Sequence, residues 1–163
     1  MSKFLKAAMA TSALVASVVG ANAAEAATAA ADAKANILAQ VSVASDGIAL
    51  DFGTIVTGAA ASTVSVSGGG RACGAGLVCS GASSAAGFNV TGTADQSVSV
   101  ASDPSVTLNS GSNSMTASIV SSVSTLTLTG GTGSFNVGGL LNVGANQADG
   151  AYTGTFNVTV NYN

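Results

Sequence analysis

The two cysteines, Cys73 and Cys79, are the side chains whose type and spacing most directly suggest chemistry. They lie six positions apart in the glycine-rich stretch GGGRACGAGLVCSGASS. A metal site or a redox-active pair is the alternative to a disulfide, but the chain has no histidine and the spacing is not CxxC. In an oxidising compartment, a structural disulfide is the simplest interpretation. Closing a loop of this size would stabilise the fold by roughly 2.4 kcal/mol in the chain-entropy model.

The other reactive groups do not form a recognisable catalytic set. Serine is abundant, but a serine nucleophile needs a base, and there is no histidine. Asp46 and Asp51 are close in sequence, yet such carboxylates usually mark solvated turns and strand ends. Asp95, Asp103 and Asp149 also lie beside turn signals, and the glycine-rich stretches lack a phosphate-loop pattern. We therefore predict no catalytic residue, no metal site and no small-molecule cofactor: the chain is not expected to be an enzyme.

Residues 1–23 have the pattern of a secretory signal peptide. Lys3 and Lys6 give a positive start, an apolar run follows, and small residues precede the predicted cut after Ala23, with Ala26 as a second candidate. A membrane anchor is the alternative, but the run is shorter than the ~20 residues that span a bilayer. After cleavage two cations face seven carboxylates, which excludes a nucleic-acid-binding protein. We expect export through the periplasm to the cell surface.

The rest of the chain predicts short β-strands. Only 7% of the residues are charged, and apolar residues from Ile48 onward alternate with polar ones between glycine, asparagine and serine turns. Strands at a spacing of roughly 8–12 residues indicate a β-sandwich or barrel. No segment after residue 45 has a convincing helical period.

The stretch GAYTGTFNVTVNYN at the end of the chain is the most regular of these strands. Its apolar face consists of Phe156, Val158, Val160 and Tyr162, and its other face is polar and uncharged. Edge strands are normally blunted by a charge or a proline, but this one has neither. An unprotected edge is a template for another strand.

A second alternation lies near the other end of the chain, where every odd position from Ala27 to Val43 is apolar. It is longer than a typical strand of about 5–6 residues. We therefore predict a free extension over residues 24–35 and a domain over residues 36–163. Because alanine has the highest helix propensity, a helix or disorder in the isolated monomer is the alternative. The residues predicted to serve as a donor strand are Ala29, Ala31, Ala33, Ala35, Ile37, Val41 and Val43.

The end of the chain resembles that of chaperone–usher pilus subunits. In those proteins a glycine lies fourteenth from the C-terminus and an aromatic residue, usually tyrosine, is penultimate; here these positions hold Gly150 and Tyr162. The segments Leu50–Gly53, Phe135–Leu140 and Gly150–Gly154 complete a pattern similar to a family of secreted bacterial domains of unknown function. That family is allied to common-pilus fimbrillins and spore-coat-U-type secreted pilins. The resemblance covers about residues 36–163.

This resemblance implies an incomplete immunoglobulin-like β-sandwich whose missing strand is supplied by the extension of another copy. It also implies a periplasmic chaperone and an outer-membrane usher as partners. The residues implied to pair with the chaperone or to form the donor-strand groove are Gly150, Tyr152, Phe156, Val158, Val160 and Tyr162. Two features depart from the best-known pilins: the cysteines are close together, and the extension is rich in alanine.

We therefore expect a structural subunit of a surface fibre, serving adhesion or biofilm formation. One alternative is a monomeric secreted binding module or matrix adhesin with an exposed aromatic platform. Another is an amyloid-like biofilm fibre, because flat Ser/Thr/Val strands can stack.

Overall fold

The computed structural model describes residues 26–163, in which there are twelve β-strands and no helix. The strands are β1 (Ser42–Ser45), β2 (Thr54–Val56), β3 (Ser62–Ser67), β4 (Gly70–Cys73), β5 (Val78–Ser80), β6 (Ala86–Thr91), β7 (Ser97–Ser102), β8 (Ser105–Ser110), β9 (Asn113–Ser121), β10 (Thr125–Thr127), β11 (Thr132–Val143) and β12 (Val158–Tyr162). The prediction of an all-β fold is confirmed. In this part of the chain no helix could cross a membrane. The predicted signal peptide lies outside the described residues.

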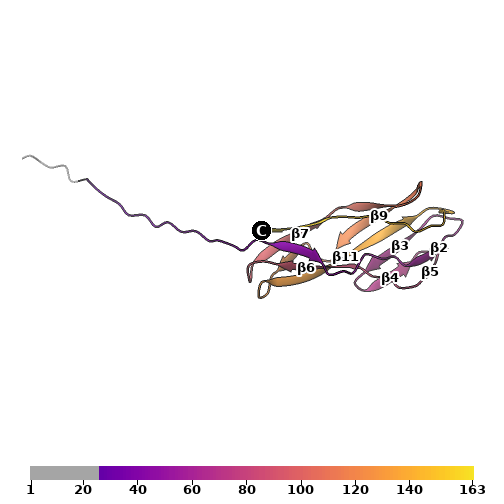
Figure 1. Ribbon diagram of the computed structural model, residues 1–163, viewed down its shortest axis with the longest axis horizontal. Helices are drawn as coiled ribbons and strands as arrows, with labels where there is room; N and C mark the ends of the chain where they lie inside the picture. Colours follow the sequence, from indigo (N-terminus) through magenta and orange to yellow (C-terminus); the bar gives the residue numbers. More distant parts are fainter. Residues whose placement is uncertain (1–25) are drawn as a thin grey trace, which may run out of the picture. The chain divides into compact units, whose positions relative to one another are not determined.

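Strand β11 is the centre of the larger sheet (Figure 1). Along one edge, residues 132–137 pair with β6 and residues 139–143 pair with β3. Along the opposite edge, residues 137–142 pair with β9, which in turn pairs with β8. β1 extends the sheet beyond β6, and β4 extends it beyond β3. All of these pairings are antiparallel.

The alternation of residue types in the sequence decides which face of each strand is buried. In β11, Phe135, Val137, Leu141 and Val143 are buried, whereas Asn136 and Asn142, which lie between buried neighbours, are exposed. Side chains of successive strand residues point to opposite faces, so one face of β11 packs on the core and the other meets solvent.

A second sheet, in the order β10-β7-β12, packs its apolar face against the same core. The buried residues of the second sheet are Val98, Val100 and Val160, and those of the larger sheet include Val64, Val90, Val137 and Leu141. Two antiparallel sheets that share one core form a β-sandwich, as the sequence predicted. Strands β2 and β5 form a separate two-stranded sheet, which Figure 1 shows beside β3 and β4.

Gly138 and Gly139 allow close packing in the middle of β11. A Cβ atom at Gly138 would overlap the carbonyl oxygen of Val66 on β3. A Cβ atom at Gly139 would lie 3.3 Å from the ring of Phe52 and 3.2 Å from the side chain of Leu50. The glycine pair therefore makes room for a neighbouring strand and for the segment that contains Phe52.

The chain divides after Ala35 into two units. In the first unit, residues 26–35 are exposed and contain neither helix nor strand. In the second unit, residues 36–41 precede β1 and also lack regular structure. We call residues 26–38 the leading segment. Of the alternating stretch from Ala27 to Val43, only Ser42 and Val43, at the start of β1, therefore belong to a strand.

Candidate functional site: a groove beside an edge strand

A groove of about 660 Å³ opens on the surface of the sandwich. Its first wall is residues 50–57, which include β2, and its second wall is residues 147–152, which lead toward β12. Its floor consists of Leu108, Met115, Leu141 and Val143. Leu141 and Val143 are buried, whereas Leu108 and Met115 are only half-buried, so the groove leaves part of the apolar floor uncovered.

The groove offers apolar surface and backbone groups rather than reactive side chains. Its lining contains no histidine, lysine, arginine or cysteine. The two carboxylates in the lining, Asp51 and Asp149, are both exposed. Within residues 26–163, β5 is the only strand that pairs with β2, so the other edge of β2 has backbone groups without a ladder partner. Such a site suits an extended peptide.

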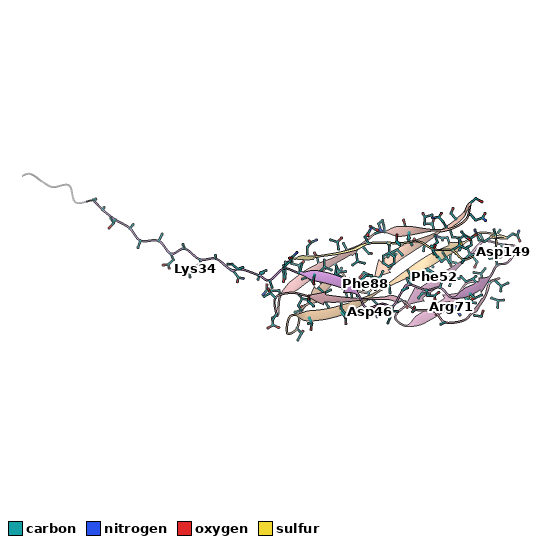
Figure 2. The ribbon with its side chains drawn as sticks, viewed as in Figure 1. Lys34, Asp46, Phe52, Arg71, Phe88 and Asp149 are labelled. Atoms are coloured by element: carbon teal, nitrogen blue, oxygen red, sulfur yellow. A yellow bond between two sulfur atoms is a disulfide. The ribbon has the colours of Figure 1, made fainter. Side chains whose placement is uncertain are left out.

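Short-range hydrogen bonds and the β2–β5 pairing hold the first wall in place. The Oδ1 atom of Asp51 accepts a hydrogen bond of 2.7 Å from the amide of Gly53. The backbone groups of Asp51 and Ser84 exchange two hydrogen bonds of 2.8 and 3.0 Å. One Nη1 atom of Arg71 donates to the carbonyl oxygen of Phe52 at 3.0 Å (Figure 2). Two charged groups, the Asp51 carboxylate and the Arg71 guanidinium, therefore hold the backbone of this wall by hydrogen bonds.

Tyr152 shapes the second wall. Its hydroxyl donates to the carbonyl oxygen of Ala148 at 2.9 Å and accepts from Nε2 of Gln147 at 2.8 Å. These two hydrogen bonds fix the ring of Tyr152 against residues 147–148, six residues before β12 begins. Gly150 has φ of +148°, which a side chain rarely adopts, and a Cβ atom there would overlap Ser110. The predicted groove residues Gly150 and Tyr152 thus both lie in the groove wall.

The other four predicted groove residues lie outside the groove lining, although they share one face as expected. Phe156 packs edge-on against Phe88, with ring centroids 6.3 Å apart, and Val160 is buried in the core. Val158 and Tyr162 are half-buried on β12. Among the described strands, β12 pairs with β7 alone, so its far edge has no ladder partner. These residues therefore form an edge strand rather than a wall of this groove.

Tyr162 has a role that the sequence did not suggest. Its hydroxyl accepts a hydrogen bond of 2.7 Å from the amide of Thr93 and donates one of 2.8 Å to the carbonyl oxygen of Ala39. The amide of Ala39 donates in turn to Oγ1 of Thr93 at 2.7 Å. A Cβ atom at Gly92 would overlap the Tyr162 hydroxyl, so this glycine is needed for the contact. Ala39, which directly follows Leu38 at the end of the leading segment, is thus anchored to the domain by hydrogen bonds with Thr93 and with Tyr162 of β12.

This anchor revises the predicted donor residues. The side chains of Ala29, Ala31, Ala33, Ala35 and Ile37 are exposed, and Ile37 is 90% exposed. Val41 and Val43, by contrast, pack against the core of their own domain, and Val43 pairs with Val90 of β6. Val43 thus belongs to β1 and Val41 directly precedes it, and both are half-buried against their own domain rather than part of the free segment.

The predicted disulfide is present: Cys73 and Cys79 are bonded. Residues 26–163 contain no group of three or more side chains that could hold a metal ion. Aspartates of this region serve local structure; for example, Oδ2 of Asp103 accepts hydrogen bonds from the amide and the side chain of Asn157 at 2.8 and 3.0 Å.

A family model described as a domain of unknown function, DUF4402, matches residues 41–162. No curated protein and no solved structure matches the chain. The matched range begins two residues after Ala39 and contains both walls of the groove, the disulfide and β12. Because the family model matches most of the sequence, the chain belongs to the DUF4402 family.

Proposed function

We propose that this chain is a structural subunit of a bacterial surface fibre, in which the leading segment of one copy fills the groove of the next. One observation carries the proposal: the domain has an open apolar groove beside an edge strand, and the same chain has an exposed segment of alternating pattern. An added strand would cover the apolar floor of the groove and pair with the free edge of β2, and the exposed segment has the alternating pattern of a strand.

Apolar burial and backbone pairing together favour this assembly. Full burial of Ile37, which is 90% exposed, is worth roughly 1.5–3 kcal/mol. Backbone hydrogen bonds to the free edge of β2 add about 0.5–1.5 kcal/mol each. The alanines contribute little through their side chains, but small side chains allow the inserted strand to lie close to Leu108 and Met115. The Ile37 side chain is thus the main apolar anchor.

The same logic gives a polymer rather than a closed dimer. The donated segment and the accepting groove are different surfaces, so each added copy brings a new groove or a new segment. Such a head-to-tail contact grows into a filament unless its rotation closes a ring. A fibre built in this way suits adhesion or biofilm formation.

The proposal includes export and assembly partners. A disulfide is typical of an oxidising compartment, which supports passage through the periplasm. A free groove would expose apolar surface before assembly, so a periplasmic chaperone would have to cover it, and an outer-membrane usher would exchange that chaperone for the next subunit. These partners follow the resemblance to chaperone–usher pilins.

A glycan-binding module is the second candidate, since a groove of 660 Å³ falls in the range of about 300–1,000 Å³ that is usual for small-molecule sites. It would need an exposed aromatic platform. Of the aromatic side chains in residues 26–163, Phe52 and Phe135 are buried and the other four are half-buried. We therefore favour a peptide strand as the ligand.

Charge in the groove floor provides the direct test. Met115→Glu should leave the free domain folded, because Met115 is half-buried and open to the groove. It should abolish fibre growth by the mature chain, because a donated strand would bury the new carboxylate without a partner. Met115→Leu, the matched control, should form fibres as the unchanged chain does.

Fibre growth can be followed by sedimentation and negative-stain microscopy. Deletion of residues 27–35 should also leave a monomer, which should bind a synthetic peptide of residues 26–38 at its free groove. Normal fibres from the deletion variant, or from Met115→Glu, would contradict the proposal. A monomeric chain that binds glycans instead would favour the second candidate.

A further inference from the structure

We propose that Arg71 and the Cys73–Cys79 disulfide form a clip that fixes the first wall of the groove, so that acceptance of a strand depends on both. The inference rests on the proposed function of the groove and assigns positioning residues to it. It starts from the few ladder contacts of the wall, which among the described residues are those of β2 with β5 and of Asp51 with Ser84.

The disulfide joins β4 of the larger sheet to β5, which is the strand that pairs with β2 of the wall. In the β2–β5 pair, Ile55 of the groove lining lies opposite Cys79. In the β3–β4 pair, Cys73 lies opposite Val64, whose side chain is completely buried in the core. The line from Ile55 through Cys79 and Cys73 to Val64 thus ties the groove wall to the core. Without the sulfur–sulfur bond, β2 and β5 could move together as a unit.

Arg71 of β4 links the wall and β5 to the larger sheet through hydrogen bonds. Its Nη1 atom donates to the carbonyl oxygens of Phe52, at 3.0 Å, and of Ser80, at 2.9 Å. Its Nη2 atom donates to the carbonyl oxygen of Gly81 at 3.4 Å. The planar fork of a guanidinium group holds several acceptors in fixed positions, which a lysine ammonium group cannot do. Arg71, on β4, therefore links the wall and the end of β5 to the larger sheet by hydrogen bonds. Figure 2 labels Arg71 and Phe52 in the same part of the domain.

Gly53 leaves the space that the Arg71 side chain of the clip occupies. Its φ is +74°, and a Cβ atom there would overlap Nη1 of Arg71 and lie 2.8 Å from the carbonyl oxygen of Ser80. Any side chain at this position would displace the guanidinium group. The sequence alone assigned no structural role to the adjacent residues Phe52 and Gly53. In the structure, the Phe52 carbonyl oxygen accepts a hydrogen bond from Arg71, and Gly53 leaves space for the guanidinium group.

The clip predicts a specific effect on the groove. When either part is removed, the core should remain, because its buried residues Val90, Val98 and Val137 lie away from the groove lining. The first wall should loosen, and a strand in the groove would lose one of the two surfaces that it must contact. Binding should therefore weaken more than the global stability loss explains.

The test uses the mature full-length chain with Arg71→Met, Arg71→Lys and the double variant Cys73→Ala/Cys79→Ala. Hydrogen exchange of residues 52–56 measures the wall directly, and the anisotropy of a labelled peptide of residues 26–38 measures binding. Leu128→Val is the control, because Leu128 is fully buried beside Gly92 and Gly133 and does not line the groove. Arg71→Lys serves as a milder variant if Arg71→Met fails to fold.

We expect exchange over residues 52–56 to rise at least ten-fold in the clip variants, and peptide affinity to fall at least ten-fold. The control should change neither quantity. Unchanged exchange at these residues in folded clip variants, or affinity equal to that of the unchanged chain, would overturn the clip. If the unchanged chain does not bind the peptide at all, the proposed function fails, and the exchange measurement still decides whether the clip holds the wall.

Discussion

The hydroxyl group of Tyr162 should contribute measurably to stability because it links three parts of the chain. It accepts a hydrogen bond from the amide of Thr93 and donates one to the carbonyl oxygen of Ala39. Tyr162→Phe removes both hydrogen bonds and keeps the ring. At a net of about 0.5–1.5 kcal/mol per hydrogen bond, the free energy of unfolding should fall by about 1–3 kcal/mol.

The sites at which hydrogen exchange increases distinguish the loss of this specific anchor from a general loss of stability. Tyr152→Phe is the matched control, since the hydroxyl of Tyr152 also makes two hydrogen bonds. Both variants should be less stable in guanidinium denaturation. Only Tyr162→Phe should speed hydrogen exchange at Thr93 and along residues 39–45, because only that hydroxyl holds the start of the domain.

Two results would refute the argument. The first is a Tyr162→Phe variant with the stability and the Thr93 exchange of the unchanged chain. The second is equal loosening of residues 39–45 in Tyr152→Phe, which would show that this region responds to any weakening of the fold.

The structure predicts the effect of three further substitutions on stability. Cys73→Ala/Cys79→Ala should lower the free energy of unfolding by roughly 2.4 kcal/mol in denaturation experiments, through the added entropy of the unfolded chain. Gly138→Ala should cost about 1–3 kcal/mol because its Cβ would overlap the backbone of β3, and a thermal melt like that of the unchanged chain would contradict this packing. Asp103→Ala should cost about 1 kcal/mol, allowing for solvent screening, and should raise hydrogen exchange at the amide of Asn157.

The sequence predicted the features that depend on local pattern. The period of two from Phe156 to Tyr162 correctly placed these side chains on one face, because burial of a strand follows alternation directly. The disulfide followed from the spacing of two cysteines in a chain without histidine.

The features that the sequence did not predict depend on contacts between distant segments. The groove lies between residues 50–57 and 147–152, and no local pattern brings these ranges together. The hydrogen bond from Tyr162 to Ala39 joins residues 123 positions apart. Val43 was assigned to the donor strand because the alternation is continuous across residue 39, whereas its burial depends on pairing with β6. Periodicity shows that a strand forms but not which partner it finds.

The position of Ala39 has a mechanical consequence for a fibre. If copies are linked through their leading segments, a pull on the chain enters each domain at this residue and passes directly into β1. The first bonds to carry that tension are those of Ala39 with the Tyr162 hydroxyl and with Thr93, and the short ladder between β1 and β6, ahead of the deep core. The force at which such a filament extends would therefore depend on a single phenol, one threonine hydroxyl and four residue pairs at the edge of each domain.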